Sequence, residues 1–331
     1  MKEASGERLT IDVRWQPGDY VETMAREVEQ GLRQSPKTLP SKYFYDDRGS
    51  DLFEEITRLP EYYQSRTEQA ILELIAPELM AGGEFHELLE IGSGSSTKTR
   101  TLLDAMTASG SRTRYVPLDI SEETLRESAR RLVARYPTLE VHGVVADFTE
   151  HLGQVPTAKD RRLAIFLGST IGNLDRDERV SFLREVRGLL GPNDRFLLGL
   201  DLVKDVTRLE AAYNDSAGVT AEFNRNVLRV INRQLDGNFV VETFEHRAFY
   251  NRSEARIEMH LVAKERQEVE LLKARLTLEL STGDDIRTEI SCKFTRESAD
   301  DMLSQAGMRL ERWFTDPENL FALALATTAE R

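Results

Sequence analysis

Cysteine is almost absent from this chain of 331 residues: Cys292 is the only one, so no internal disulfide can form. Such low cysteine usage is typical of a reducing compartment, and we expect a cytoplasmic protein. Residues 1–15 lack the apolar segment of a secretory signal, and no apolar run reaches the roughly 18 residues that a membrane helix needs. We therefore expect no contact with a membrane.

The chain also lacks a metal-ligand pattern and an excess of positive charge. Its five histidines show no metal-site spacing, so we expect no metal. The net charge of −13 at pH 7 is unfavourable for contacts with a phosphate backbone, and nucleic acid is not expected as a partner. The length nevertheless allows one large domain or two ordinary ones with a real apolar core.

Strand-like and helix-like segments alternate between about Phe85 and Val203. Apolar runs predict strands near residues 86–91, 114–118, 139–145, 162–168 and 194–201, and helices near residues 96–108, 122–135 and 178–190. Almost continuously apolar strands separated by helices indicate a parallel sheet covered on both faces. An α/β fold is therefore expected.

The regions on either side of this segment have different sequence patterns. Residues 21–80 are expected to be mostly helical, with Asp51 capping a helix that ends at Ile56. Four tyrosines crowd this region and favour a lid or a pocket wall: Tyr43, Tyr45, Tyr62 and Tyr63. Residues 204–296 continue from a helical stretch into alternating segments that predict an antiparallel sheet. The C-terminal residues resume helix-then-strand order and are expected to complete the first sheet.

The segment ELLEIGSGSSTK, residues 87–98, is the most informative in the chain. A buried strand ends at Ile91, a Gly-x-Gly turn follows, and small hydroxyl residues open a helix, which is how an α/β sheet presents backbone N–H groups to a nucleotide-like ligand. The next two strands deliver Asp119 and then Asp147 with Phe148 to the same edge. A nicotinamide fold usually needs only the first acid, and Thr97 stands where its third glycine would fall, so S-adenosylmethionine is favoured.

Two further groups of residues are candidates for substrate contacts. The loop FLGSTIGNLD follows the fourth strand and offers Asn173, whose amide both donates and accepts hydrogen bonds, although a plain Gly-Asn turn is the alternative. Glu289 and Ser291 are two residues apart in an expected strand, so they share one face. Together they could bind a nitrogen heterocycle, or they could be ordinary cross-strand partners.

Seven segments, in order, give the chain a specific resemblance from about Val21 to Ala326: SKYFYDDRGSDLFEEITRLPEYY, ELLEIGSGSSTKTRTLLDAM, FLGSTIGNLD, LGLDLVKD, AAYNDSAGVTAEFNRNVL, RIEMHL and TEISCKF. They resemble the S-adenosylmethionine-dependent histidine N-alpha-methyltransferases of ergothioneine biosynthesis. The resemblance implies a Rossmann-like class I methyltransferase sheet with an added α+β substrate-binding domain. Residues 67–203 and 294–331 would form the methyltransferase domain, residues 21–66 and 204–293 the substrate domain, and residues 1–20 a tail without usable resemblance.

The resemblance also implies roles for individual residues. Those that would hold S-adenosylmethionine are Gly92, Lys98, Asp119, Asp147 and Phe148. Those that would hold the amino-acid end of L-histidine are Tyr62, Asn173 and Tyr213. Glu289 and Ser291 would recognise the imidazole, with Met259 shaping the pocket, and Tyr45 would border the amine that Asn173 positions for reaction.

The implied reaction is three methyl transfers to the α-amino group of L-histidine, giving its trimethylated betaine, hercynine. A deprotonated α-amine needs little acid–base assistance, because it titrates near neutral to mildly basic pH. Two alternatives stay open: the same chemistry on another amino acid such as tryptophan, and a non-catalytic cofactor-binding module or nicotinamide dehydrogenase. We expect a monomer, although no feature of the sequence tests that expectation.

Overall fold

The computed structural model describes residues 8–14, 17–81, 84–108 and 112–329, which belong to two compact units. The first unit combines residues 1–15, 66–202 and 294–331. The second combines residues 16–65 and 203–293, so it is built from two segments that are far apart in the sequence. Each unit has a sheet of its own.

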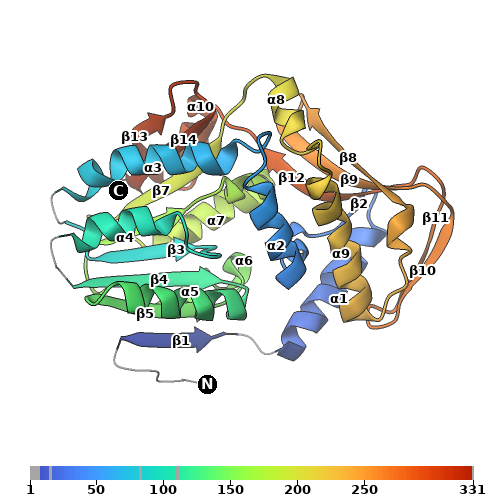
Figure 1. Ribbon diagram of the computed structural model, residues 1–331, viewed down its shortest axis with the longest axis horizontal. Helices are drawn as coiled ribbons and strands as arrows, with labels where there is room; N and C mark the ends of the chain where they lie inside the picture. The colour runs from blue at the N-terminus through green and yellow to red at the C-terminus, as the bar shows by residue number, and fades with distance from the viewer. Residues whose placement is uncertain (1–7, 15–16, 82–83, 109–111, 330–331) are drawn as a thin grey trace. The chain divides into compact units, whose positions relative to one another are not determined.

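The first unit contains an eight-stranded sheet in the order β1-β5-β4-β3-β6-β7-β14-β13. The strands are β1 (Leu9–Val13), β3 (Glu87–Ile91), β4 (Thr113–Asp119), β5 (Leu139–Val145), β6 (Arg162–Phe166), β7 (Arg195–Asp201), β13 (Met308–Thr315) and β14 (Phe321–Thr328). The first six in this order are parallel, and β14 is antiparallel to both of its neighbours. Figure 1 shows β3, β4 and β5 pointing the same way, so the loops after them share one edge of the sheet.

Helices cover both faces of this sheet. They are α3 (Gln64–Met80), α4 (Thr99–Thr107), α5 (Glu122–Arg135), α6 (Phe148–His151), α7 (Arg176–Gly188) and α10 (Arg296–Gln305), with the 3-10 turns η2 (Leu152–Gln154) and η3 (Thr170–Asn173). Apolar residues of α3, α4 and α5 form one core with Leu163 and Ile165 of β6. Phe166, the next residue, points to the opposite face and packs against Phe182 of α7, with 4.7 Å between ring centroids.

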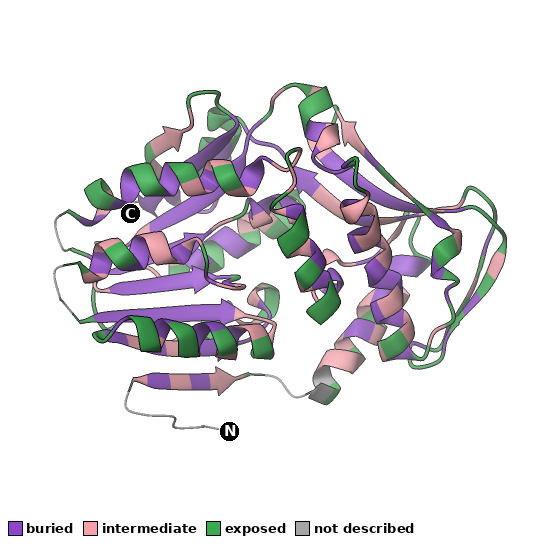
Figure 2. Ribbon diagram, viewed as in Figure 1, coloured by how far each residue is buried: buried purple, intermediate pink, exposed green. Residues whose placement is uncertain are grey.

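Figure 2 shows the resulting layers: central strands such as β3 and β4 are buried, and the helices that cover the sheet are exposed on their outward sides. The sequence-based prediction of a parallel α/β sheet with helices on both faces is confirmed. The helix-then-strand order expected at the C-terminal end of the chain also completes the first sheet, as α10 followed by the antiparallel strands β13 and β14.

Strand β1 departs from the expectation of an N-terminal tail. Leu9–Val13 pair in parallel with Val141–Val145 of β5, and Leu9 and Ile11 are buried in the core. The sequence LTIDV does alternate apolar and polar residues, but a single five-residue alternation gives only a weak signal for a strand. By pairing β5, this strand covers an edge that would otherwise expose unpaired backbone groups.

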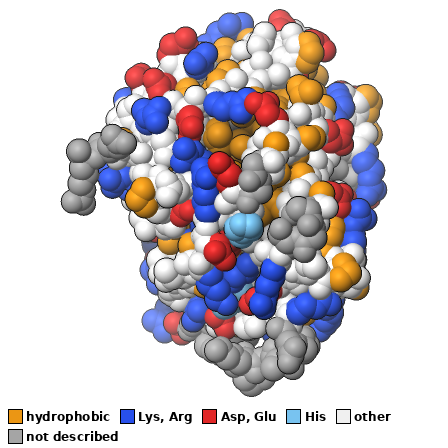
Figure 3. All heavy atoms as spheres, turned by 90° about the vertical axis from the view of Figure 1, so that its left-hand side faces the viewer, with side chains coloured by type: hydrophobic (Ala, Val, Ile, Leu, Met, Phe, Trp, Pro, Cys, Tyr) orange, Lys and Arg blue, Asp and Glu red, His pale blue; other side chains and the backbone are white. Residues whose placement is uncertain are grey.

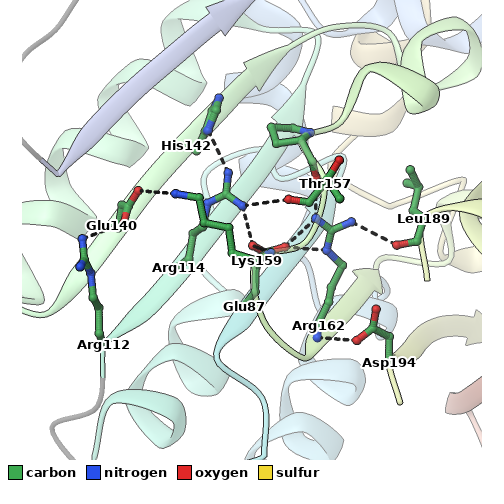
Figure 4. Close-up of polar contacts among 11 residues, drawn as sticks. Glu87, Arg112, Arg114, Glu140, His142, Thr157, Lys159, Arg162, Leu189 and Asp194 are labelled. Atoms are coloured by element: carbon green, nitrogen blue, oxygen red, sulfur yellow. Dashed lines mark hydrogen bonds and ion pairs between the residues drawn. The ribbon is translucent and has the colours of Figure 1, made fainter. Parts of the chain in front are cut away.

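A buried cluster of charges lies at the amino ends of the parallel strands (Figure 4). The Glu87 carboxylate of β3 accepts hydrogen bonds from Arg114 Nη1 of β4 at 2.6 Å and from Arg162 Nε of β6 at 2.7 Å. Arg162 also donates to the backbone carbonyls of Pro156 and Leu189. Three neighbouring strands are therefore joined by charged groups whose partners compensate for their burial.

The outer surface at this side of the first unit is shown in Figure 3, where lysine and arginine side chains are interspersed with acidic ones. Within the described ranges, no helix is both long enough and apolar enough to cross a membrane. The same residues include no group of three or more histidine, cysteine, aspartate or glutamate side chains arranged to hold a metal ion.

The second unit contains a four-stranded sheet in the order β2-β12-β9-β8, beside a β10-β11 hairpin. Its elements are α1 (Pro17–Arg33), β2 (Lys37–Thr38), η1 (Ser41–Phe44), α2 (Asp47–Ile56), α8 (Val206–Ala211), α9 (Val219–Leu235), η4 (Val241–Thr243), β8 (Phe244–Asn251), β9 (Arg256–Ala263), β10 (Gln267–Leu271), β11 (Leu276–Leu280) and β12 (Asp285–Cys292). Strands β8, β9 and β12 are antiparallel, as the alternating segments predicted.

The start of helix α2 corrects a sequence-based prediction. Asp46, not Asp51, is the N-cap, and its carboxylate accepts the backbone N–H of Gly49 at 2.8 Å. The same carboxylate also accepts hydrogen bonds from Asn226 and Arg233 at 2.7 Å each. Asp51 lies inside the helix and is exposed. Both aspartates suit an N-cap, and the partners on α9, far away in sequence, favour the earlier one.

Candidate active site

The glycine turn after β3 brings its backbone to the acid at the end of β4. Gly92 and Gly94 have φ angles of +68° and +47°, which residues with a side chain rarely adopt. Gly94 donates its N–H to Asp119 Oδ2 at 2.7 Å, and Ser121 donates its N–H to Oδ1 at 2.9 Å. A Cβ atom placed on Gly94 would meet nothing within 4 Å, so the turn is open on that side.

Burial raises the pKa of Asp119, and the backbone N–H groups of Ser121, Gly94 and Ile120 oppose that rise. Each carboxylate oxygen accepts one of the two hydrogen bonds from Gly94 and Ser121, which leaves room for further donors on both. The glycine turn at Gly92 and Gly94 thus lies directly beside Asp119, at the sheet edge where the motif predicted both.

Asp147 lies one strand further along the same edge. The backbone N–H of Ala146 donates to the Asp119 carbonyl at 2.9 Å, which fixes the ends of β4 and β5 together. Asp147 is also the N-cap of α6, because Oδ1 accepts both the N–H and the hydroxyl of Thr149. Phe148 packs against Phe166 and Phe182 with ring centroids 5.3 and 5.7 Å apart, so this ring forms an aromatic wall beside the edge.

A buried acid that the sequence analysis missed lies beneath the glycine turn. Glu90 accepts hydrogen bonds from the hydroxyls of Thr99, at 2.5 Å, and of Tyr115. Burial raises its pKa to about 7, with the Thr99 and Tyr115 hydrogen bonds opposing the rise. Tyr115 in turn is bonded to Ser96 at 2.9 Å, so the network supports the backbone of the turn. The signal available was a charged residue between Leu89 and Ile91 in a strand-like segment.

Lys98 has a carboxylate partner that the sequence analysis also missed. Its Nζ lies 2.5 Å from Oε2 of Glu68, a completely buried residue of α3. Glu68 additionally accepts the backbone N–H of Gly168 at 2.8 Å, and therefore links Lys98 to the loop after β6. Gly199 of β7 makes room for this carboxylate, since a Cβ there would come within 2.2 Å of Glu68 Oε1.

The loop after β6 is a fixed structure that presents Asn173. Gly168 and Ser169 have φ angles of +76° and +57°, and the Ser169 hydroxyl accepts the backbone N–H of Asp201 at 2.8 Å. Asn173 is the last residue of η3, and its φ is not positive, so the tolerance of asparagine for left-handed backbone does not explain its presence. No described residue forms a hydrogen bond with its partly exposed side chain.

In the second unit, Glu289 and Ser291 lie on one face of β12, as their spacing predicted. Met259 of β9 is directly opposite Glu289, and Ile257 is opposite Ser291. Burial raises the pKa of Glu289 to about 7, although the positive charge of Lys293 acts in the other direction. No described residue donates a hydrogen bond to the Glu289 carboxylate. A half-buried carboxylate that receives no hydrogen bond from the described residues can accept an N–H group from a ligand.

Ser291 is joined to Tyr213 and to a residue that the sequence analysis did not select. Tyr213 Oη donates to Ser291 Oγ at 2.8 Å, and Lys293 Nζ donates to Ser291 Oγ at 2.8 Å and to Tyr213 Oη at 3.0 Å. All three residues are buried. The only available signal for Lys293 was a lysine next to Cys292 at the end of an apolar strand, which is not specific.

The four clustered tyrosines separate into two pairs. Tyr43 and Tyr63 are core residues, 2% and 3% exposed, and the lid or pocket wall stays a prediction for all four. Tyr45 and Tyr62 are half-buried and flank Phe53, with ring centroids 5.6 and 6.2 Å from it. Apolar packing of a tyrosine inside a helical domain gives the same sequence pattern as a pocket wall.

The predicted site residues are thus distributed over both units. Gly92, Lys98, Asp119, Asp147, Phe148 and Asn173 belong to the first, and Tyr45, Tyr62, Tyr213, Met259, Glu289 and Ser291 to the second. Within the first, the structure brings the glycine turn to Asp119 and the end of β5. Within the second, it brings Tyr213 to Ser291 and Met259 to Glu289.

A glycine turn and two strand-end acids on a mostly parallel α/β sheet define a Rossmann-like protein with a site for a nucleotide-type cofactor at this edge. Residues 24–328 match the model of the family described as "Histidine-specific methyltransferase, SAM-dependent", and the chain belongs to that family. S-adenosylmethionine is therefore its methyl donor.

Three relatives illustrate the similarity. The chain is 48% identical over 305 residues to a histidine N-alpha-methyltransferase of Mycolicibacterium smegmatis, covering 92% of this chain and 95% of the relative. It is 46% identical over 303 residues to the protein of the same name from Mycobacterium tuberculosis, covering 92% and 94%. An "Ergothioneine biosynthesis protein 1" of Neurospora crassa is 31% identical over 302 residues, which are 85% of this chain and 32% of that protein.

Proposed function

We propose that this protein transfers three methyl groups from S-adenosylmethionine to the α-amino group of L-histidine, giving hercynine for ergothioneine biosynthesis. The family and the two mycobacterial relatives support this proposal. The single structural observation that carries it is the Glu289 carboxylate, which faces apolar Met259 across the strands and receives no hydrogen bond from any described residue.

The first unit is proposed to hold S-adenosylmethionine, which supplies a methyl group activated by a positively charged sulfur. The open turn at Gly92 and Gly94 allows close approach to the backbone, and Asp119 retains acceptor capacity for the ribose hydroxyls. Asp147 would accept the adenine amino group, with Phe148 beside the ring. Lys98, which is held in place by its ion pair with Glu68, would make a further contact with S-adenosylmethionine.

The second unit is proposed to recognise the imidazole. Glu289 would accept the ring N–H, Ser291 would meet the other ring nitrogen, and Met259 would shape the space beside them. Tryptophan fits these residues poorly, because an indole offers one donor and no acceptor nitrogen. A ring with neither group would leave the half-buried Glu289 carboxylate without a hydrogen-bond donor, which is costly.

The amino-acid end of histidine is proposed to contact Asn173, Tyr45, Tyr62 and Tyr213. Asn173 has no accessible pKa, so its role is to position the amine, not to move its proton. Holding the nucleophile and the methyl carbon at about 3–3.5 Å supplies most of the rate in such a transfer. Tyr213, whose hydrogen is directed to Ser291, would accept an N–H of the amine through its oxygen.

The test is an incubation of the purified full-length protein with S-adenosylmethionine and all twenty amino acids, followed by mass spectrometry. We expect histidine alone to gain one, two and finally three methyl groups. Methyl gain on tryptophan instead would assign the protein to other amino acids. Binding of S-adenosylmethionine without methyl gain on any of the twenty would contradict an amino-acid methyltransferase.

A further inference from the structure

Lys293 occupies an unusual position at the end of β12. Its side chain is 4% exposed, and its ammonium group donates to Ser291 Oγ at 2.8 Å and to Tyr213 Oη at 3.0 Å. It also lies over the Tyr213 ring, 4.9 Å from the centroid. Burying an ammonium group is expensive, and packing alone would be served by an apolar side chain of similar length.

The donors and acceptors of this trio determine the direction of one hydroxyl. An ammonium group has only donors, so Ser291 Oγ must accept from Lys293. The same oxygen accepts from the Tyr213 hydroxyl at 2.8 Å, which fills both of its lone pairs. The Ser291 hydrogen must then point elsewhere, and no described residue accepts it. Any further hydrogen bond that Ser291 makes to a ligand must therefore be one in which Ser291 donates.

Glu289 provides the complementary half on the same face of β12, two residues before Ser291. A carboxylate accepts, so the pair presents one acceptor and one donor. A neutral imidazole matches that pair in a single tautomer, with its N–H at Glu289 and its bare nitrogen at Ser291. An imidazolium ion, which has two donors and no acceptor, would leave the Ser291 hydroxyl opposed to an N–H.

We propose that Lys293 is a positioning residue that fixes Ser291 as a hydrogen-bond donor, so that the site selects a neutral ring with an acceptor nitrogen beside an N–H. This inference rests on the proposed function, because it concerns how histidine is chosen. Lys293 acts through Ser291 and does not itself contact the substrate.

The main test compares histidine with an alanine derivative that carries a pyrrole ring, which keeps the N–H and has a C–H in place of the acceptor nitrogen. Affinities are measured by calorimetry on the full-length protein with S-adenosylhomocysteine present. The wild type should bind histidine roughly tenfold or more tightly than the pyrrole compound, the scale of one unpaired buried donor. In K293M the Ser291 hydroxyl can turn to Tyr213, so this ratio should fall severalfold.

Two further variants separate positioning from mere packing. K293Q keeps an N–H donor and should keep the ratio near the wild-type value. S291A should lower the ratio as K293M does, and K293M added to S291A should change it no further. An unchanged ratio in K293M, or effects of K293M and S291A that simply add, would overturn the proposal. Unchanged affinity for S-adenosylhomocysteine and an unchanged melting temperature confirm that each variant is folded.

A measurement on the wild type makes the test independent of whether K293M folds. Nitrogen NMR of ring-labelled histidine bound to the protein should show one neutral tautomer. A bound imidazolium or a mixture of tautomers would overturn the role of Lys293. Failure of the wild type to bind histidine at all would instead contradict the proposed function, so the two failures are distinguishable.

Discussion

The backbone N–H of Gly94 donates to Oδ2 of Asp119 across 2.7 Å, so the glycine turn and the acid of the next strand are parts of one arrangement. The two residues are 25 positions apart, and the parallel pairing of β3 with β4 brings them together. Asp119 therefore has two tasks: it fixes the shape of the turn, and it is the proposed acceptor for the ribose of the methyl donor.

Replacing Asp119 with alanine should weaken binding of S-adenosylmethionine by roughly 1.5–3 kcal/mol, the scale for losing hydrogen bonds to a charged acceptor. Calorimetry with S-adenosylmethionine measures this directly. The control is D160A, which removes an exposed aspartate of the same unit and should leave the affinity unchanged. Equal affinities of D119A and the wild type would remove Asp119 from the site.

Glu90 should make the stability depend on pH. Burial raises its pKa to about 7 from the ordinary glutamate value of 4.5, so the folded protein binds a proton here that the unfolded chain has released. Its contribution is therefore most favourable below about pH 4.5 and is lost as the pH rises through about 7, by an amount on the order of a few kcal/mol.

The glutamine variant E90Q cannot titrate and should lack this dependence. Urea unfolding of both proteins between pH 4.5 and pH 7.5 gives the difference in free energy of unfolding, which should shift in favour of E90Q as the pH rises. Other groups, such as His246, whose pKa is lowered first of all by burial, affect both proteins equally and cancel. A difference that does not change with pH would mean that Glu90 titrates normally.

The Glu87 cluster should matter far more for stability than a surface ion pair. Glu87 is completely buried, and E87Q would leave Arg114 and Arg162 without their carboxylate. Removing one partner of a buried pair costs about 3–5 kcal/mol. The pair of Arg112 and Glu140, joined at 3.1 Å with the arginine 80% exposed, provides the control, and R112A should cost less than about 1 kcal/mol. Similar losses in the two variants, measured by urea unfolding, would contradict this account.

Much of the first unit could be predicted because its signals are local. Apolar runs mark the strands from β3 to β7. An acid at the end of a strand can be identified from the apolar run that directly precedes it. Asp119 and Asp147 then reach the same edge because parallel strands must align. The fold and the glycine turn follow from such short-range patterns.

The residues that the sequence did not reveal depend on contacts between distant segments. Lys293 lies 80 positions from Tyr213, and Glu68 lies 30 positions from Lys98, so no local spacing marks either pair. The choice of Asp46 over Asp51 as the cap of α2 is similar, because it depends on Asn226 of another helix. In each case, the residues near in sequence did not distinguish the observed partner or cap from other candidates.

Asn173 should position the substrate without taking part in proton transfer. The loop that holds it is fixed by Ser169 and by Glu68, so N173A should leave the loop intact and remove only the amide. Turnover of histidine should fall by on the order of a hundredfold, since an error of about 1 Å in the nucleophile can have that effect. Steady-state kinetics on N173A measure this loss of turnover. The control is N193A, which removes the side chain of an exposed asparagine in the same unit and should leave turnover unchanged. Near-native turnover in N173A would make this loop an ordinary turn.

The choice of histidine should depend on Glu289 and Met259, which face each other across β12 and β9. E289A removes the proposed acceptor for the ring N–H, so it should lower the catalytic efficiency for histidine much more than it lowers affinity for S-adenosylmethionine. Sites built to bind a polar group can reject analogues that lack it by factors on the order of ten thousand. Adding M259A should open space for an indole and raise activity on tryptophan.

The deciding quantity is the ratio of kcat/KM for histidine to kcat/KM for tryptophan, which we expect to fall at least about tenfold in E289A and further in the double variant. The control is I290V, because Ile290 is the next residue of β12 and points to the other face of the sheet. Its ratio should match that of the wild type. If E289A also leaves the ratio where it was, Glu289 and Met259 are only cross-strand neighbours, and recognition of the imidazole must come from other residues.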